Sequence, residues 1–170
     1  MNSMALNPLY ETMETLLEQH ERMLELSEQK KQAIIRNEVN RLTEITTKES
    51  RLLKQVITAE ESRVSAAKAF LLEKGIQPSE ENLKLSHIIQ YVTSFEDKRK
   101  LSSLRKKLLE LVERLKLVNE QNTILIQQAI KFNDFSLDLL MGDDQEVTYR
   151  RPTDTYSNKG VNLRTFDSKA

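Results

Sequence analysis

Apolar residues recur along the first 35 residues at alternating steps of four and three. This rhythm is typical of a helix that presents one seam to partner helices in a coiled coil. Pro8 stands near its start, where a missing backbone N–H costs little. The pattern predicts a helix over about residues 8–35. Its seam positions are Leu9, Met13, Leu16, His20, Met23 and Ser27.

A second apolar series follows residue 38 and does not continue the rhythm of the first. Asn37 is a favourable N-cap residue, so the change of register predicts a break near it and a second helix over about residues 38–74. Gly75 suits a left-handed cap after this helix, and Pro78 blocks its continuation. The apolar positions are Val39, Leu42, Ile45, Leu52, Leu53, Val56, Ala59, Ala66, Ala67, Phe70 and Leu71.

Two further helices are predicted after Pro78. Ser79 and the acidic residues behind it favour a short helix over about residues 80–92. Thr93 and Glu96 have the spacing of a capping box, which predicts the start of the last and longest helix, over about residues 94–141. The seam of this helix contains Leu101, Leu104, Leu108, Leu111, Leu115, Val118, Asn122, Leu125, Ala129, Phe132, Ser136 and Leu139.

Residues 143–170 lose all periodicity and concentrate Gly, Pro, Asp, Ser, Thr and Asn. Such a segment buries too little apolar surface to offset its ordering entropy, which predicts a flexible C-terminal tail. The expected fold class is therefore all-α: an antiparallel three-helix coiled coil or bundle with a short extra helix in the crossover. We expect the helical coiled-coil domain over residues 1–142.

The last helix carries two unusual features in its C-terminal half. Asn119 and Asn122 lie within it, and Asn122 occupies a seam position, where a polar residue lowers stability but fixes register or partner number. Beyond them the helix is apolar on more than one face, so part of it should lack an internal partner, and such a surface usually marks a binding site. The alternative is that these residues complete the bundle or a homodimer. The additional apolar positions are Ile124, Ile126, Ile130, Phe135, Leu137 and Leu140.

Composition and charge narrow the function. Charged residues make up 31% of the 170 residues, Lys plus Arg equals Asp plus Glu at 26 each, and there is no cysteine. Because the opposite charges are equal in number, the chain as a whole is not attracted to nucleic acid or to an acidic membrane. Because it has no cysteine, disulfides and thiolate chemistry are excluded. The basic segment EDKRKLSSLRKK is interpreted as a solvated helix face rather than a nucleic-acid site. No secretory signal or run of ~20 apolar residues occurs, so we expect a cytoplasmic protein without membrane insertion.

Candidate catalytic residues are few. His20 and His87 lie in different predicted helices, and His20 occupies a seam position typical of a packed histidine. The carboxylates alternate with Lys and Arg at helical spacing, as on a solvated face. Glycines stand alone at 75, 142 and 160, so no phosphate-binding loop is present, and no spacing suits a metal. We expect no enzyme activity and no cofactor.

Three segments carry a resemblance to a known family. The segment AIIRNEVNRLTEITTKESRLLKQV has a break followed by spaced apolar residues and a double leucine, LKLVNEQNTILIQQAIKF has two asparagines three apart before an aromatic residue, and YSNKG places Tyr156 four residues before Gly160. Together they resemble the FlgN-type flagellar export chaperones over nearly the whole chain.

The resemblance implies a cytosolic chaperone that binds the C-terminal helical segments of the two hook–filament junction proteins, prevents their premature assembly and delivers them for export. It also implies docking on the cytosolic domain of the large export-gate subunit, with Tyr156 and Gly160 as expected contacts. The alternative is a self-associating coiled-coil scaffold without a client. The expected client-binding residues are Asn119, Asn122, Leu125, Ile126, Ala129, Ile130, Phe132, Leu139 and Leu140.

Overall fold

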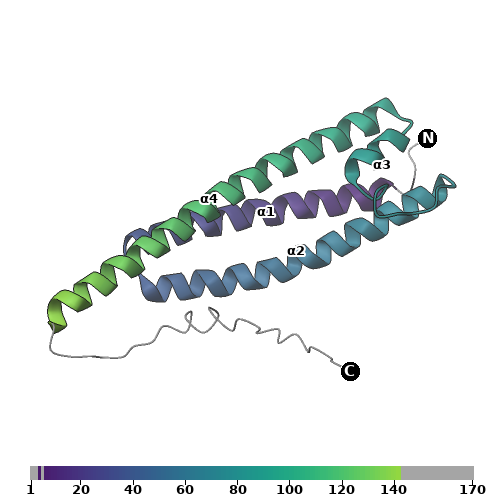
Figure 1. The fold of residues 1–170 in the computed structure, drawn as a ribbon. Helices are drawn as coiled ribbons and strands as arrows, with labels where there is room; N and C mark the ends of the chain where they lie inside the picture. The colour runs from purple at the N-terminus through teal and green to yellow at the C-terminus, as the bar shows by residue number, and fades with distance from the viewer. Residues whose placement is uncertain (1–3, 5, 143–170) are drawn as a thin grey trace, which may run out of the picture. The chain divides into compact units, whose positions relative to one another are not determined.

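The protein is all-helical over the residues that its computed structural model describes, which are residue 4 and residues 6–142. The four helices are α1 (Leu6–Ile35), α2 (Val39–Glu73), α3 (Leu85–Tyr91) and α4 (Phe95–Met141) (Figure 1). This confirms the predicted fold class, and α3 is the predicted short helix in the crossover. The expected C-terminal tail lies outside the described residues. Among the described helices, none is long and apolar enough to cross a membrane.

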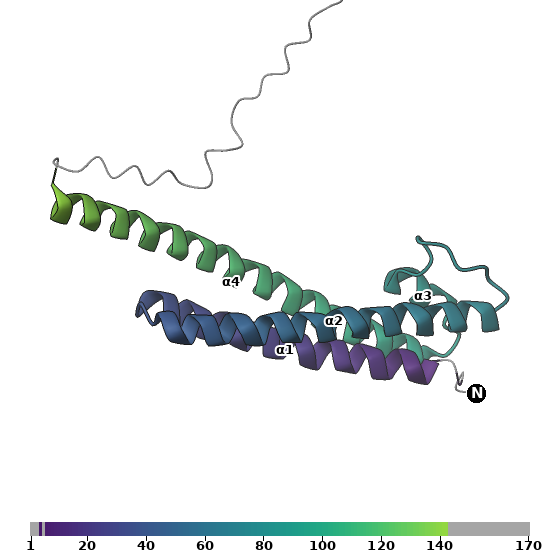
Figure 2. The same cartoon turned by 90° about the horizontal axis from the view of Figure 1, so that it is seen from below.

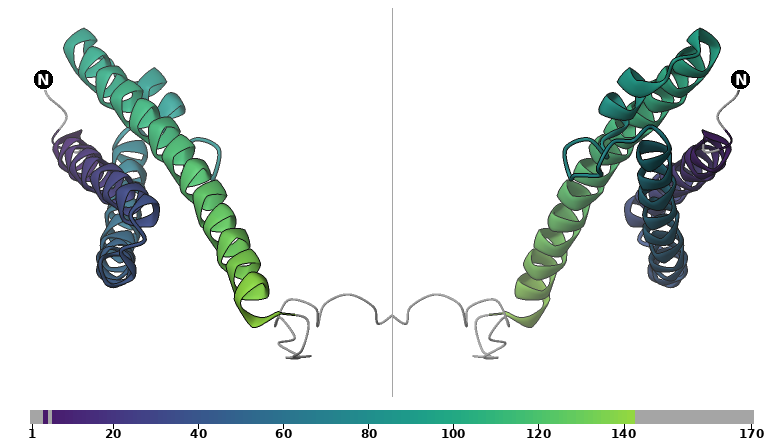
Figure 3. Two further views of the ribbon diagram at one scale, coloured as in Figure 1. Left: turned by 90° about the vertical axis from the view of Figure 1, so that its left-hand side faces the viewer. Right: turned by 90° about the vertical axis from the view of Figure 1, so that its right-hand side faces the viewer.

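The chain divides into two units, Met1–Phe132 and Asn133–Ala170, and the packing described here is that of the first. In this unit α1 and α2 form an antiparallel hairpin, and they lie side by side in two perpendicular views (Figures 1 and 2). α3 lies beside the first turns of α4 (Figure 3). The hairpin and the short helix α3 place the apolar seams of α1, α2 and α4 so that they face a common core.

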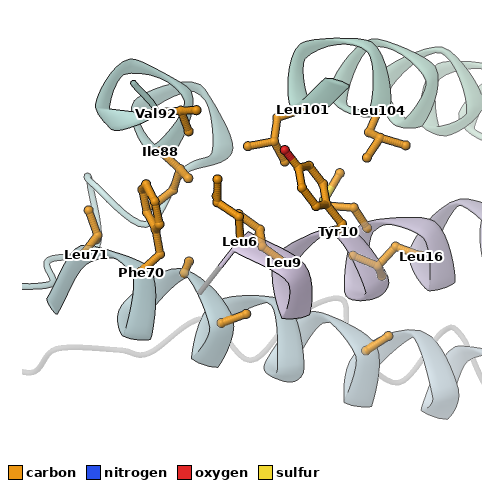
Figure 4. Packing of buried hydrophobic residues seen from close by; sticks show 14 residues of the cluster. Leu6, Leu9, Tyr10, Leu16, Phe70, Leu71, Ile88, Val92, Leu101 and Leu104 are labelled. Carbon is orange, nitrogen blue, oxygen red and sulfur yellow. The ribbon is translucent and has the colours of Figure 1, made fainter. Parts of the chain in front are cut away.

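The main core lies where the start of α1, the end of α2, α3 and the start of α4 meet (Figure 4). Leu9, Phe70, Ile88 and Leu101, one from each helix, are completely buried there. Burying each such side chain contributes about 1.5–3 kcal/mol. The core is therefore concentrated at one end of the helices. It consists of Leu6, Leu9, Tyr10, Met13, Leu16, Ala59, Ala66, Ala67, Phe70, Leu71, Ile88, Val92, Leu101 and Leu104.

Asn37 ends α1, and the prediction that its side chain caps α2 is wrong. It has a positive φ of 57°, and the residue at the N-cap of α2 is Glu38, without a side-chain capping bond. The Asn37 N–H donates to the Ile34 carbonyl at 3.1 Å, and the Glu38 N–H donates to the Ala33 carbonyl at 2.9 Å. This pair of bonds is a Schellman motif, in which asparagine is the usual substitute for glycine.

Gly75 ends α2 as predicted. Its φ is 73°, its N–H donates to the Leu72 carbonyl at 2.9 Å, and the Ile76 N–H donates to the Leu71 carbonyl at 2.9 Å. Ile76 also packs against the main core, so the turn directs the chain toward α3. The short helix begins at Leu85 rather than near residue 80, because turns occupy the intervening residues.

α4 begins one residue later than its predicted capping box. The Asp97 N–H donates to the Ser94 hydroxyl oxygen at 3.4 Å, so Ser94 and not Thr93 supplies the capping side chain. Asp97 is buried, and its Oδ1 accepts a 2.7 Å hydrogen bond from the Tyr10 hydroxyl. Burial and this hydrogen bond raise the pKa of Tyr10. The contact attaches the first turn of α4 to α1.

Candidate functional site

The burial of the seam residues changes along α4. Leu101, Leu104, Val118 and Asn122 are buried, which agrees with the predicted seam up to Asn122. The seam leucines between them, Leu108, Leu111 and Leu115, are half-buried. Asn122 is the last buried position among the described residues of α4.

Asn122 is held by α1 through a polar contact. Its side chain is 3% exposed, and its Nδ2 donates to the Ser27 backbone carbonyl at 2.9 Å. The Ser27 hydroxyl, also buried, donates to Asn119 Oδ1 at 3.1 Å. The two asparagines therefore contact the same residue of α1, one through its backbone and the other through its side chain. This double contact fixes the register between α1 and α4.

α2 joins this contact through an ion pair. Lys30 Nζ lies 2.8 Å from Glu49 Oε2, and both side chains are largely buried. Glu49 Oε1 also lies 3.5 Å from the Ser27 hydroxyl oxygen, which has one proton and is closer to Asn119. We call the group Ser27, Lys30, Glu49, Asn119 and Asn122 the polar junction. It connects α1, α2 and α4 at one level.

Beyond Asn122 the described part of α4 has no buried residue. Leu125, Ile126 and Ala129 are half-buried, and Ile130 and Phe132 are exposed, Phe132 at 69%. We call these five residues the distal face. They belong to the first unit, and they form an apolar surface on the segment that follows the polar junction.

The other expected site residues lie elsewhere. In the second unit, Leu139 and Leu140 are both exposed on the last turns of α4. Tyr156 and Gly160 lie outside the described residues. Asn119 and Asn122 contact α1, so the structure places them at the start of the apolar surface and not within it.

The sequence did not identify Ser27, Lys30 and Glu49 as parts of the site. Ser27 was recognisable as a polar residue in the seam of the first helix, the same anomaly as Asn122 in the last. Pairing the two polar seam positions was the available signal. Lys30 and Glu49 gave none, because charged residues at helical spacing occur throughout the chain.

The described residues show no arrangement for catalysis. His20 Nδ1 lies 2.7 Å from the Leu16 carbonyl oxygen in its own helix, and no carboxylate or nucleophile of the described residues is bonded to this ring. No group of three or more His, Cys, Asp or Glu side chains within residues 6–142 could hold a metal ion. An open depression of about 440 Å³ between α1 and α2 is lined by Thr15, Lys54 and Ser62, among others, and the Ser62 hydroxyl donates to the Thr58 carbonyl at 3.0 Å.

Comparisons with known proteins agree over almost the full length. The sequence model of the family described as "FlgN protein" matches residues 1–160. The Bacillus subtilis (strain 168) protein YvyG, which carries the description "uncharacterized protein", is 31% identical over 167 residues, and the match spans 98% of this chain and 100% of YvyG. No solved structure matches this chain.

Proposed function

Since this chain belongs to the FlgN family, we propose that it is a flagellar export chaperone whose client-binding surface begins where the polar junction ends. Membership of the family supports the general chaperone role. The single observation that supports the position of the surface is the change in burial along α4. Up to Asn122 the seam contains buried residues between half-buried leucines, and after Asn122 the described apolar residues of α4 are only half-buried or exposed.

We propose that the occupant of the distal face is an amphipathic helix from the C-terminal segments of the hook–filament junction proteins. Leu125 and Ala129 continue the seam spacing and Ile126 widens it, so a client helix could take the place that a bundle helix takes earlier along α4. Recognition of an apolar helix in a groove uses this spacing of contacts. Covering the client's apolar residues would keep it soluble and unassembled until export.

The polar junction gives this proposal a physical boundary. A client that extended its contacts past Asn122 would have to displace hydrogen bonds to Ser27, and a buried donor left without a partner costs about 1–3 kcal/mol. We therefore include Asn119 and Asn122 in the proposed site as the residues that limit the client's register. Leu139 and Leu140, in the second unit, are proposed as separate client contacts.

The test replaces distal-face residues and follows the client. Leu125→Ser with Ile126→Ser should abolish co-purification of the two junction proteins and leave the helical circular dichroism close to that of the wild type. Leu53→Ser with Ile57→Ser is the matched control, because both residues are exposed on α2. Retained co-purification in the distal-face variant, or equal loss in the control, contradicts the proposed surface.

Delivery is a separate proposal. We propose that Tyr156 and Gly160 dock the chaperone on the cytosolic domain of the large export-gate subunit, which places its action in the cytoplasm. The support is the YSNKG segment and the family match, which reaches residue 160. Tyr156→Ala should weaken binding to the purified gate domain and leave client binding unchanged. Equal binding of the variant contradicts this role.

Self-association would cover the same apolar surface. A second copy of the chain on the distal face predicts a dimer whose dissociation follows concentration in sedimentation equilibrium and which the Leu125→Ser and Ile126→Ser substitutions weaken. A chaperone that binds its client there predicts that the client competes with any such dimer. A dimer that excludes the client at all concentrations would favour a scaffold over a chaperone.

A further inference from the structure

The first turns of α4 carry a second exposed face with a regular arrangement. Phe95, Ser102 and Leu109 follow one another at intervals of seven residues, so they lie nearly in line along about 21 Å of the helix. Phe95 is 78% exposed and Leu109 is 46% exposed. This line points away from the seam, because the buried Leu101 and Leu104 lie on the other side of the helix.

Four cations lie on either side of this line. Lys98 and Arg105 lie on one side, and Arg99 and Lys106 lie on the other, each pair again seven residues apart. All four are exposed, and none forms an ion pair with any residue in the described part of the chain. We call these four residues with Phe95 and Leu109 the basic stripe.

Lys100 shows how a cation on the same turns behaves when the chain itself provides a partner. Its Nζ lies 3.7 Å from Glu14 Oε1 and 4.1 Å from the centroid of the Tyr10 ring. The cations of the basic stripe face away from α1 and have no such carboxylate. They are solvated, and so they are available to an acidic partner from outside the first unit.

We propose that the basic stripe is a second docking surface and that its partner is an acidic amphipathic helix of another protein. In two-stranded coiled coils an apolar seam is flanked by charged residues that pair with opposite charges on the partner and set its identity and orientation. The basic stripe has one seam position per heptad, at Phe95, Ser102 and Leu109, and its cations, all of one sign, stand three and four residues after Phe95 and after Ser102. A matching helix places apolar side chains on Phe95 and Leu109 and carboxylates opposite the four cations.

Nucleic acid and membrane fit the same face less well. A phosphate backbone would use the cations but would leave the exposed Phe95 and Leu109 between them without a function. Helices that lie on membranes carry their cations on the face opposite the apolar one, whereas here the two share a face. The chain has no net charge that would add long-range attraction to either.

The two surfaces are far enough apart to act independently. Leu109 and Leu125 are separated by 16 residues, or about 24 Å of helix. A partner on the basic stripe therefore does not displace a client on the distal face. The inference depends on neither the client nor the gate, and substitutions on the distal face should leave it unchanged.

The experiment measures binding of the full chain to a designed helix. The probe is a peptide of about 21 residues in three heptads, with leucine at the seam positions and glutamate at the flanking positions, and its twin has lysine at the flanking positions. We expect titration calorimetry to show binding of the glutamate peptide only, and the affinity to fall several-fold between about 50 and about 300 mM NaCl. Lys98→Glu with Arg105→Glu should weaken binding by about tenfold or more.

Two further variants separate charge from position. Lys48→Glu with Arg51→Glu makes the same change of net charge on exposed residues of α2 that form no ion pair in the described chain, and it should bind the peptide like the wild type. Leu109→Ser should weaken binding while keeping its dependence on salt. Absence of binding by the wild type, or equal binding by both double variants, overturns the proposal. The proposal is also overturned if the wild type binds a DNA duplex or phosphatidylserine vesicles instead of the peptide and the reversal of Lys98 and Arg105 abolishes that binding.

Discussion

Asn122 donates a hydrogen bond from its Nδ2 to the backbone carbonyl of Ser27, 95 residues earlier in the chain and 2.9 Å away. The bond joins α4 to α1 at the last buried position of α4 within the described residues. The other half of the same amide has no such partner, since Asn122 Oδ1 is buried without a hydrogen bond in the described structure. The contact therefore sets the register of α4 on α1, and the unpartnered oxygen lowers the stability of the fold.

Replacing this amide should make the protein more stable and the alignment of α4 on α1 less uniform. Asn122→Leu removes an unsatisfied buried oxygen and adds apolar surface to the seam, so we expect the free energy of unfolding to rise by about 1–2 kcal/mol. Urea denaturation followed by circular dichroism measures this. Gln128→Leu, on an exposed position of the same helix, should change it by less than about 0.5 kcal/mol.

The same variant tests the role in register. Without the bond to Ser27, α4 loses its buried polar contact with α1 at this level and keeps only the Asn119 bond to Ser27, so oligomeric state or client preference should become less uniform. Sedimentation equilibrium and competition between the two junction proteins report these changes. A lower stability of Asn122→Leu would show that the amide is a net stabilising contact, which contradicts the argument.

The position of Asn122 could be predicted from the sequence, but its partner could not. The regular spacing of apolar residues placed Asn122 in the seam, and the structure buries it there. Ser27 stands out as a polar residue in the seam of α1, but the bond goes to its backbone carbonyl, which every residue has, so this pattern does not identify the accepting atom. Only the alignment of two helices that are distant in sequence selects it.

The errors at helix ends have a similar cause. Asparagine favours both an N-cap and the left-handed position after a helix, and Asn37 takes the second role because the chain turns there into α2. Thr93 and Ser94 are adjacent and almost equivalent as caps. Ser94 is used because it brings Asp97 to the Tyr10 hydroxyl, a contact that depends on tertiary packing. Gly75 was predictable because few other residues adopt its conformation at low cost.

The left-handed conformation of Asn37 leads to a second prediction. Asn37→Gly should stabilise the protein slightly, by up to about 0.5 kcal/mol, and Asn37→Ala should destabilise it by about 1 kcal/mol, because φ of 57° strains a residue with a Cβ that cannot form local polar contacts. Thermal unfolding of the two variants beside the wild type provides the measurement. Equal stability of the two variants would show that the turn relaxes when its residue is changed.

At Gly75 the cost of a left-handed conformation can be measured without a clash of the added side chain. A Cβ at this position would meet no atom within 4 Å, so the cost of Gly75→Ala comes from its φ of 73° alone. We expect a loss of about 1 kcal/mol in the free energy of unfolding, measured in urea. A much larger loss would indicate that the connection to α3 is displaced from the main core.

The contact between Tyr10 and Asp97 predicts a dependence of stability on alkaline pH. Burial and the hydrogen bond to Asp97 raise the pKa of Tyr10 in the folded protein, whereas the unfolded chain keeps a value of about 10. The folded state therefore binds more protons above that pH, so the stability that this difference contributes is complete below about pH 10 and is lost as the pH rises further. Tyr10→Phe should be less stable at neutral pH by about 1–2 kcal/mol, and the difference should shrink above pH 10. A constant difference across pH 8–11 in urea denaturation would contradict the assigned cause.

The ion pair of the polar junction provides the last prediction. Lys30 and Glu49 join α1 to α2 with largely buried side chains, so removing one partner leaves the other charge poorly solvated. We expect Glu49→Gln and Lys30→Met each to lower the free energy of unfolding by about 1–3 kcal/mol, and the double variant to lose less than the sum of the two. The exposed pair Arg22 and Glu18, within α1, serves as the control and should show a coupling below about 0.5 kcal/mol. If the two cycles gave the same coupling, the pair at the polar junction would contribute no more than a surface contact to the packing of α1 on α2.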